Sequence, residues 1–274
     1  MNKKVLLVLL AMLLAVSFVA GCGSTEPAPE AEATAEVESD MAYITDKGTM
    51  LIGMTLFSPM NYYEGEELVG FETEFAKAVC EKLGVTPEFV EINWDSKEIE
   101  LNAKNIDCIW NGMTITEERK QNMEITTPYM ANRQIMIVKA ENEAKYTESV
   151  DGAVVVAEKG STGEELAMGN EFFASATYNA VDAQSTGLMD VAAGTSDVLI
   201  ADYVMAVGSI GEGTDYEDLV IIDKSFTADE YGVAFRKGSD MTAKVNEVIA
   251  ELLADGTLKE IADKYKLGDL LFTE

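Results

Sequence analysis

The chain has 274 residues, of which 49 are acidic and 20 are basic, so its formal net charge at pH 7 is -29. A charge of this size argues against binding to nucleic acid and against adhesion to anionic lipid head groups. The sequence contains no histidine, which excludes Ser-His and Cys-His catalytic pairs as well as histidine metal sites. We expect neither a metal nor a cofactor.

The N-terminal segment has the layout of a secretory signal. Lys3 and Lys4 precede an apolar run over residues 5–20, which is shorter than the ~20 residues of a membrane span. The motif VAGC resembles a bacterial lipobox, whose cysteine is lipidated and becomes the mature N-terminus. We therefore predict a signal peptide over residues 1–21 and a lipid on Cys22 that anchors an extracytoplasmic protein to the cell membrane. The alternative is an ordinary signal followed by a chance cysteine.

Residues 22–42 carry acidic side chains, prolines and alanines but no basic residue. This composition cannot bury enough apolar surface to form a core. We predict a disordered tether, in which the like charges favour extended conformations.

Strand and helix patterns alternate from residue 43 onward, and the helix over residues 70–84 places Phe71, Phe75 and Val79 on one stripe. The first series comprises strands at 49–54, 87–92 and 106–110 and helices at 70–84 and 96–105. The second comprises strands at 134–138, 153–157, 196–202 and 218–223, and the chain closes with a strand at 231–235 and helices at 239–256 and 257–265.

This alternation predicts an α/β fold. We expect two lobes, one formed by residues 43–131 plus 228–274 and the other by residues 132–227. Ligands in open α/β sheets bind at the carboxyl ends of the strands.

The motif NGMTITEER at residues 111–119 follows a predicted strand. Thr116 is placed to cap a helix whose first turn contains Arg119. An arginine fork beside the Thr114 hydroxyl and free backbone amides can hold a carboxylate, because guanidinium donates two parallel hydrogen bonds to it. The alternative is an ordinary surface ion pair.

Two further cysteines, Cys80 and Cys108, lie among apolar neighbours. They are either a disulfide or two small buried apolar residues.

Three stretches together, LVGFETEFAKAV, IDCIWNGMTITEERK and YGVAFRKGS with the helices that follow it, resemble the polar amino acid-binding proteins of ABC importers. The resemblance covers about Thr49 to about Leu267. It implies a periplasmic-binding-protein-like (type II) fold, with two mixed sheets flanked by helices and joined by two hinge strands. It also implies a monomer that binds a free amino acid and works with an ABC permease and ATPase.

The resemblance assigns roles to residues of the first lobe. Arg119 would grip the ligand's α-carboxylate, helped by the Thr114 hydroxyl and the Gly112 backbone, and Phe57 would pack on the ligand.

In the second lobe, Asp202 would bind the α-ammonium. Donors to the carboxylate would come from the start of a helix, which is itself an anion site, at Ser161, Thr162 and Gly163. Each of these residues also has an alternative, purely structural role. Phe57 would then be a core residue, and Ser161, Thr162 and Asp202 would cap helices.

The ligand's side chain is predicted from positions that contact it in relatives. Met54 stands where relatives that bind polar or cationic side chains often have an acid. Its thioether cannot pair with a guanidinium or ammonium group, which ranks lysine, arginine and ornithine lower. Trp94 and Asn111 would face the side chain, although Trp94 also fits a half-buried aromatic. A neutral polar or sulfur-containing amino acid is favoured.

An enzymatic alternative is a cyclohexadienyl or arogenate dehydratase, since such enzymes occur on the same fold. That activity needs a general acid in the cleft. Glu158 and Glu164 are the candidates.

Overall fold

The structure is a computed structural model that describes residues 39–273. The predicted signal peptide, Cys22 and the tether up to residue 38 lie outside the described residues.

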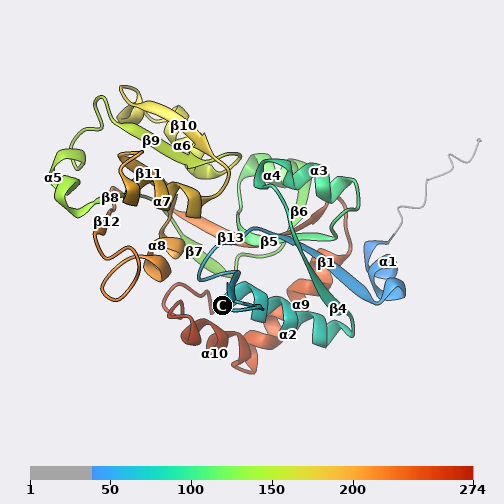
Figure 1. The fold of residues 1–274 in the computed structure, drawn as a ribbon. Helices are drawn as coiled ribbons and strands as arrows, with labels where there is room; N and C mark the ends of the chain where they lie inside the picture. Colours follow the sequence, from blue (N-terminus) through green and yellow to red (C-terminus); the bar gives the residue numbers. More distant parts are fainter. Residues whose placement is uncertain (1–38, 274) are drawn as a thin grey trace, which may run out of the picture. The chain divides into compact units, whose positions relative to one another are not determined.

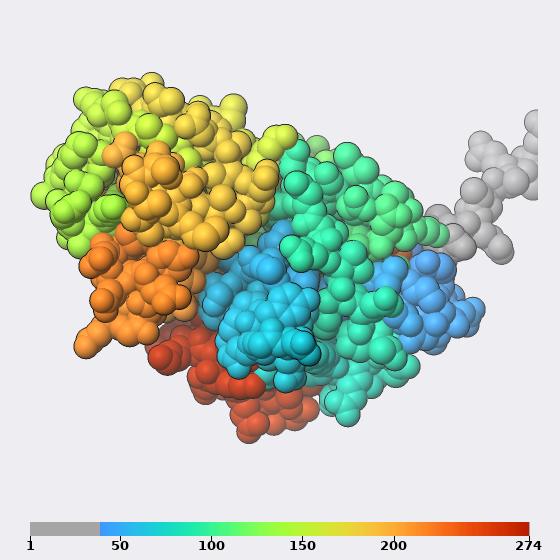
Figure 2. Space-filling view, viewed as in Figure 1, coloured from blue at the N-terminus to red at the C-terminus, as the bar shows by residue number. Residues whose placement is uncertain are grey.

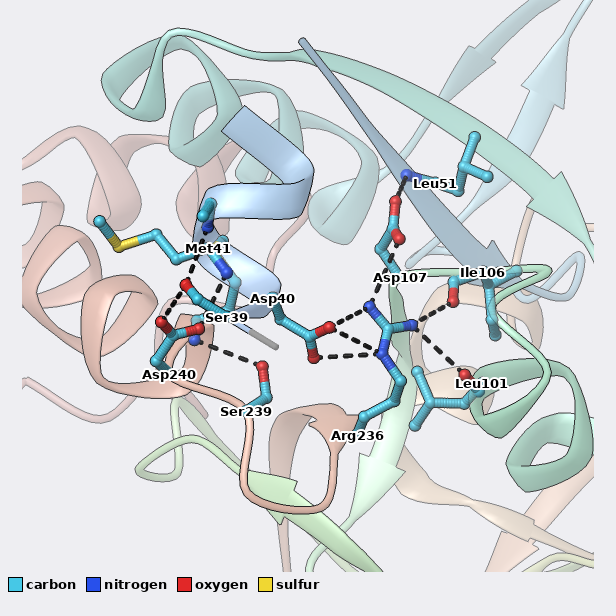
Figure 3. Close-up of polar contacts among 12 residues, drawn as sticks. Ser39, Asp40, Met41, Leu51, Leu101, Ile106, Asp107, Arg236, Ser239 and Asp240 are labelled. Carbon is cyan, nitrogen blue, oxygen red and sulfur yellow. Dashed lines mark hydrogen bonds and ion pairs between the residues drawn. The ribbon is translucent and has the colours of Figure 1, made fainter. Parts of the chain in front are cut away.

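The end of the predicted tether is wrong, because the segment beginning at Asp40 is helical. Helix α1 (Asp40–Lys47) is capped by Ser39, whose Oγ accepts a hydrogen bond from the backbone N–H of Ala42 at 3.0 Å. The Asp40 carboxylate is withdrawn from solvent because it pairs with Arg236 at 2.8 Å (Figure 3). A paired, buried acid therefore anchors a segment whose composition alone favours disorder.

The first lobe contains a sheet with the strand order β4-β1-β5-β13-β6, and β7 also pairs with β13. β1 runs parallel to β4 and β5, whereas β13 is antiparallel to β5, β6 and β7. The strands of this lobe are β1 (Thr49–Met54), the hairpin β2 (Tyr62–Glu64) and β3 (Glu67–Val69), β4 (Thr86–Glu91), β5 (Cys108–Thr114), β6 (Met123–Ile125), β7 (Met130–Asn132) and β13 (Asp229–Arg236). Its helices after α1 are α2 (Phe71–Leu83), the 3-10 turn η1 (Trp94–Ser96), α3 (Lys97–Asn102), α4 (Glu117–Asn122), α9 (Met241–Ala254) and α10 (Thr257–Lys264).

Helix α2 forms as its apolar spacing predicts. Phe71, Phe75 and Val79 are fully buried on one face, and Gly84 ends the helix in the left-handed region, with φ of 73°. Both Cys80 and Cys108 are free and buried in this core.

The second lobe repeats the arrangement with the order β10-β9-β11-β8-β12, in which β8 is antiparallel to β11 and β12 (Figure 1). Its strands are β8 (Gln134–Lys139), β9 (Val154–Glu158), β10 (Thr177–Val181), β11 (Val198–Asp202) and β12 (Leu219–Ile222). Its helices are η2 (Ala140–Asn142), α5 (Glu143–Tyr146), α6 (Thr162–Gly169), η3 (Glu171–Phe173), α7 (Gln184–Ala193) and α8 (Tyr203–Ser209). The predicted two-lobed α/β fold with mixed sheets is confirmed.

The chain passes from one sheet to the other between β7 and β8 and returns between β12 and β13. These crossings lie side by side, because Asn132 pairs with Asp229 and the backbone N–H of Gln134 donates to Thr227 Oγ1 at 2.9 Å. They form the hinge about which one lobe can rotate relative to the other.

The lobes touch each other beyond the hinge, and in Figure 2 the yellow atoms of the second lobe abut the first lobe. Lys97 Nζ donates to the Gly160 carbonyl at 2.9 Å, and Lys159 pairs with Asp95 at 2.9 Å. The structure is therefore a closed form.

Candidate functional site

A small pocket lies between the lobes, at the carboxyl ends of strands from both sheets. Its cavity volume is about 10 Å³, which is about what one water molecule needs. A larger ligand enters only after the lobes separate or side chains move. The lining residues are Phe57, Trp94, Asn111, Gly112, Thr114 and Arg119 from the first lobe, and Glu158, Ser161, Thr162, Gln184 and Asp202 from the second.

Arg119 contributes a buried positive charge to this pocket. The predicted helix cap is confirmed, since Thr116 Oγ1 accepts from the Arg119 backbone N–H at 3.1 Å. The guanidinium donates to the carbonyls of Thr114 (2.9 Å) and Gly160 (3.4 Å). The exposed Glu165 approaches it only to 4.0 Å. Burial lowers the pKa of Arg119, although Glu165 and Asp202 act in the opposite direction. Within the described residues, Glu165 is the one carboxylate at ion-pair distance from this cation.

The motif around Gly112 is part of strand β5, whereas the sequence predicted a strand that ends at residue 110. β13 causes the extension, because Tyr231 pairs with Thr114 and Gly232 pairs with Met113. Gly112 has φ of +57°, and a Cβ atom there would lie 2.9 Å from Phe57. Glycine is thus required for both conformation and space.

A buried acid behind the pocket, Glu72, holds this strand in place. Its Oε1 accepts from the Gly112 backbone N–H at 2.8 Å and from the Tyr129 hydroxyl, and its Oε2 accepts from Asn61 at 3.0 Å. Burial raises the pKa of Glu72 to about 7, although these hydrogen bonds act in the opposite direction. Asn111 belongs to the same network, since its amide donates to Thr55 and accepts from Asn61. Sequence reasoning missed Glu72 because an acid in a helix usually marks the solvated face.

Asp202 supplies a buried negative group from the second lobe. It occupies the N-cap position of α8 but makes no capping hydrogen bond. Instead its carboxylate accepts from Asn132 (2.5 Å), from Gln134 (2.7 Å) and from Gln184. Burial raises the pKa of Asp202 despite these donors. The three amide donors fix the orientation of the carboxylate.

The start of α6 lines the pocket through Ser161 and Thr162. Ser161 Oγ caps the helix by accepting from the Glu164 N–H at 3.1 Å, and Thr162 Oγ1 accepts from Gln134 at 3.0 Å. Gly163 is not a lining residue, since it lies behind them against Gln134. The capping interpretation of Ser161 is thus compatible with a place in the pocket.

Of the three apolar residues predicted to contact the ligand, Phe57 and Trp94 line the pocket and Met54 does not. Phe57 and Trp94 line the pocket, each 5% exposed. Met54, at the end of β1, is 2% exposed and does not line it. The ranking of cationic side chains that relied on Met54 therefore loses its structural basis.

Glu158 lines the pocket at the end of β9 and is 5% exposed, and its Oε1 has no hydrogen-bond partner within the described residues. Burial and the neighbouring Asp202 raise the pKa of Glu158 to about 8, while Lys97 opposes the rise. The other candidate acid, Glu164, is outside the pocket, where it accepts from the Gly160 N–H (2.7 Å) and the Tyr178 hydroxyl (2.9 Å). Gln184 was not foreseen as a lining residue.

Other kinds of site find little support in residues 39–273. This part of the chain holds no group of three or more His, Cys, Asp or Glu residues arranged for a metal ion. None of its helices has both the length and the apolar character to span a membrane.

Two similar sheets that enclose a pocket with buried charges from both sides define a two-lobed ligand-binding protein. The model of the bacterial extracellular solute-binding proteins, family 3, matches residues 50–268, and the chain belongs to this family. The resemblance seen in the sequence is confirmed. The proteins of this family are extracellular, which agrees with the expected extracytoplasmic location.

Individual relatives agree with this assignment. The L-cystine-binding protein TcyJ of Escherichia coli K12 is 31% identical, over 83% of this chain and 86% of its own length. A substrate-binding protein of an ABC uptake transporter from Streptococcus pneumoniae, solved with bound histidine, has a TM-score of 0.78 and 26% identity over 85% of this chain and 98% of its own. An ancestral amino acid-binding protein described as a precursor of cyclohexadienyl dehydratase has a TM-score of 0.75 and 28% identity over 83% of this chain and 99% of its own. The chain is thus similar to binding proteins, one of which precedes an enzyme.

Proposed function

We propose that the protein binds a free amino acid between its lobes and delivers it to the permease of an ABC importer. The observation that carries this proposal is the presence of a positive group on one side of the pocket and a negative group on the other. Arg119 contributes a buried guanidinium from the first lobe and Asp202 a buried carboxylate from the second. An amino acid zwitterion has the complementary arrangement, with an anionic and a cationic end on one carbon atom.

The division of these charges between lobes explains how binding drives closure. Neither lobe alone satisfies both ends of the zwitterion, so the bound ligand has more favourable contacts in the closed form than in the open one. Closure also removes water and strengthens the charged contacts. Micromolar to nanomolar affinities correspond to about −8 to −12 kcal/mol.

The remaining lining residues have supporting roles. The hydroxyl groups of Thr114, Ser161 and Thr162 add donors near the carboxylate of the ligand, and Phe57 and Trp94 cover its apolar atoms. The relatives named for cystine and histidine are consistent with a ligand that has polar atoms in its side chain.

The direct test is calorimetric titration of the free amino acids into the protein and into Arg119→Ala. We expect at least about a 100-fold loss of affinity, because one partner of a buried charge pair is removed. Lys120→Ala is the matched control, since Lys120 lies on the same helix but is exposed and pairs with Glu117. Unchanged affinity in a folded Arg119→Ala protein contradicts the clamp.

We also propose that a lipid on Cys22 holds this monomeric binding protein at the cell membrane. The support is the lipobox-like motif at residues 19–22. Replacing Cys22 by serine is expected to release the protein into the medium. Membrane fractions that retain the variant would show that the anchor lies elsewhere.

A dehydratase-like activity is the second candidate, favoured by the buried Glu158 in the pocket. With a pKa of about 8, this carboxyl is protonated at neutral pH and has the form that a general acid requires. Incubation with prephenate or arogenate tests it by chromatography of the products. Turnover that disappears in Glu158→Gln would establish the enzyme, and no turnover leaves binding as the function.

A further inference from the structure

We propose that Glu158 is a second acidic subsite of the pocket and that it selects an amino acid with a cationic side chain. This proposal rests on the proposed function, since it concerns the ligand of the same site. It departs from the neutral ligand favoured by the sequence.

The first observation is the unpartnered oxygen of Glu158. A buried carboxylate oxygen without a donor is costly, and native proteins rarely retain one without a reason. Oε1 of Glu158 has no partner within the described residues although the side chain lines the pocket. A donor carried by a ligand would satisfy it.

The second observation is the position of Glu158 relative to Asp202. The strands β9 and β11 are parallel neighbours, with Val155 opposite Val198 and Val156 opposite Leu199. Both strands end at the pocket, so their last residues, Glu158 and Asp202, present two acids from adjacent strands. The α-ammonium of the ligand is assigned to Asp202, which leaves Glu158 available to a second group of the ligand.

The third observation concerns the groups that face Glu158 from the packed elements. Lys97, on α3, lowers the pKa of Glu158 through its charge but is not within ion-pair distance of it. The Nζ atom of Lys97 donates instead to the carbonyls of Trp94 (3.2 Å) and Gly160 (2.9 Å). Gln184, on α7, donates to Asp202 and also hydrogen-bonds the carboxyl group of Glu158, so it leaves only Oε1 of Glu158 without a partner. Arg119, on α4, is reserved for the ligand's carboxylate. A second cation on the ligand would therefore supply the partner that Oε1 of Glu158 lacks.

The aromatic residues suit the stem of such a ligand. Trp94 and Phe57 line the pocket from the first lobe, and long basic side chains pack their methylene groups against aromatic surfaces. Met54, whose neutral side chain ranked cationic ligands lower, is not among the residues that line the pocket.

The test compares L-arginine with L-citrulline, which has nearly the same shape but no side-chain charge, together with L-lysine and L-ornithine. We expect the native protein to bind at least one of the three basic amino acids at least about 10-fold more tightly than the neutral analogue. In Glu158→Gln that preferred ligand should lose about 10- to 100-fold in affinity, while binding of citrulline changes little. Glu171→Gln, an exposed acid elsewhere in the second lobe, is the control and should leave both affinities unchanged.

A proton balance gives an independent readout. A cation that binds to Glu158 displaces its proton, so calorimetry at pH 7 in buffers of different ionisation enthalpy should detect nearly one proton released per basic ligand. The release should disappear in Glu158→Gln.

The outcomes separate the two proposals. Tighter binding of citrulline, glutamine or cystine than of arginine, lysine and ornithine by the native protein overturns the acidic subsite but leaves amino acid binding intact. This ranking needs no variant, so it decides even where Glu158→Gln fails to fold. Failure of the native protein to bind any amino acid overturns both.

Discussion

Asp40→Asn removes the charge of a buried acid at the start of α1. In the native protein Asp40 accepts from Arg236 Nε (3.0 and 3.1 Å) and Nη2 (2.8 Å), and the two side chains are 9% and 10% exposed. The substitution leaves the guanidinium with the carbonyls of Leu101 (3.3 Å) and Ile106 (2.9 Å) and with Asp107 at 3.6 Å (Figure 3).

The expected loss of stability follows from these contacts. Removing one partner of a buried ion pair costs about 3–5 kcal/mol, because the other charge stays buried without full compensation. Asp107 compensates in part, so we expect about 3 kcal/mol. With a urea m-value of about 3 kcal/mol/M, the midpoint of unfolding should fall by about 1 M with an unchanged slope.

Urea unfolding followed by circular dichroism and by tryptophan fluorescence measures this shift. Asp46→Asn, on the exposed side of the same helix, should change the free energy of unfolding by less than about 0.5 kcal/mol. Because the pair is buried, 0.5 M salt should not reduce the difference. A loss for Asp40→Asn as small as that of the control would refute the reasoning.

Three further predictions concern the site. Burial raises the pKa of Glu72 from 4.5 to about 7, so the stability that its protonated form contributes, about 3 kcal/mol, is complete below about pH 4.5 and is lost as the pH rises through about 7. Glu72→Gln should therefore make the melting temperature less dependent on pH over that window. A pH profile of the variant that matches the native one would contradict this. Lys97→Met removes a hydrogen bond between the lobes and should weaken ligand binding about 10-fold and raise the radius of gyration of the ligand-free protein in X-ray scattering, whereas unchanged values would show that Lys97 does not hold the lobes together. Gly112→Ala should lower the free energy of unfolding by about 1–2 kcal/mol, measured in urea, and a stable variant would show that the strand can relax around the new methyl group.

The sequence predicts those features of the fold that depend on residues close to one another in the chain. The apolar stripe of α2 and the glycine that ends it depend on residues within one helix, so they can be recognised without the rest of the chain. The extension of β5 through Thr114 depends on pairing with Tyr231, which is far away in sequence. No local pattern contains that information.

The candidate site shows the same limit. Arg119, Asp202 and Thr114 belong to motifs at the ends of strands, and the structure brings them together in one pocket. Glu72 was missed because its burial results from the packing of α2 against the sheet. Met54 was assigned to the ligand, yet it is buried at the end of β1 and is not among the residues that line the pocket. Side-chain direction at a strand end is set by tertiary packing, which residue types do not reveal.

Strand β13 connects the hinge between the lobes with the segment that attaches helix α1 to the first lobe. At one end, Asp229 pairs with Asn132 beside the hinge; at the other, Arg236 holds α1. A pull on the chain at Ser39 therefore enters the first lobe at the end of β13 farthest from the pivot. With the proposed lipid anchor on Cys22, the first lobe would be the stationary frame, and the second lobe would be the part that swings when the pocket opens.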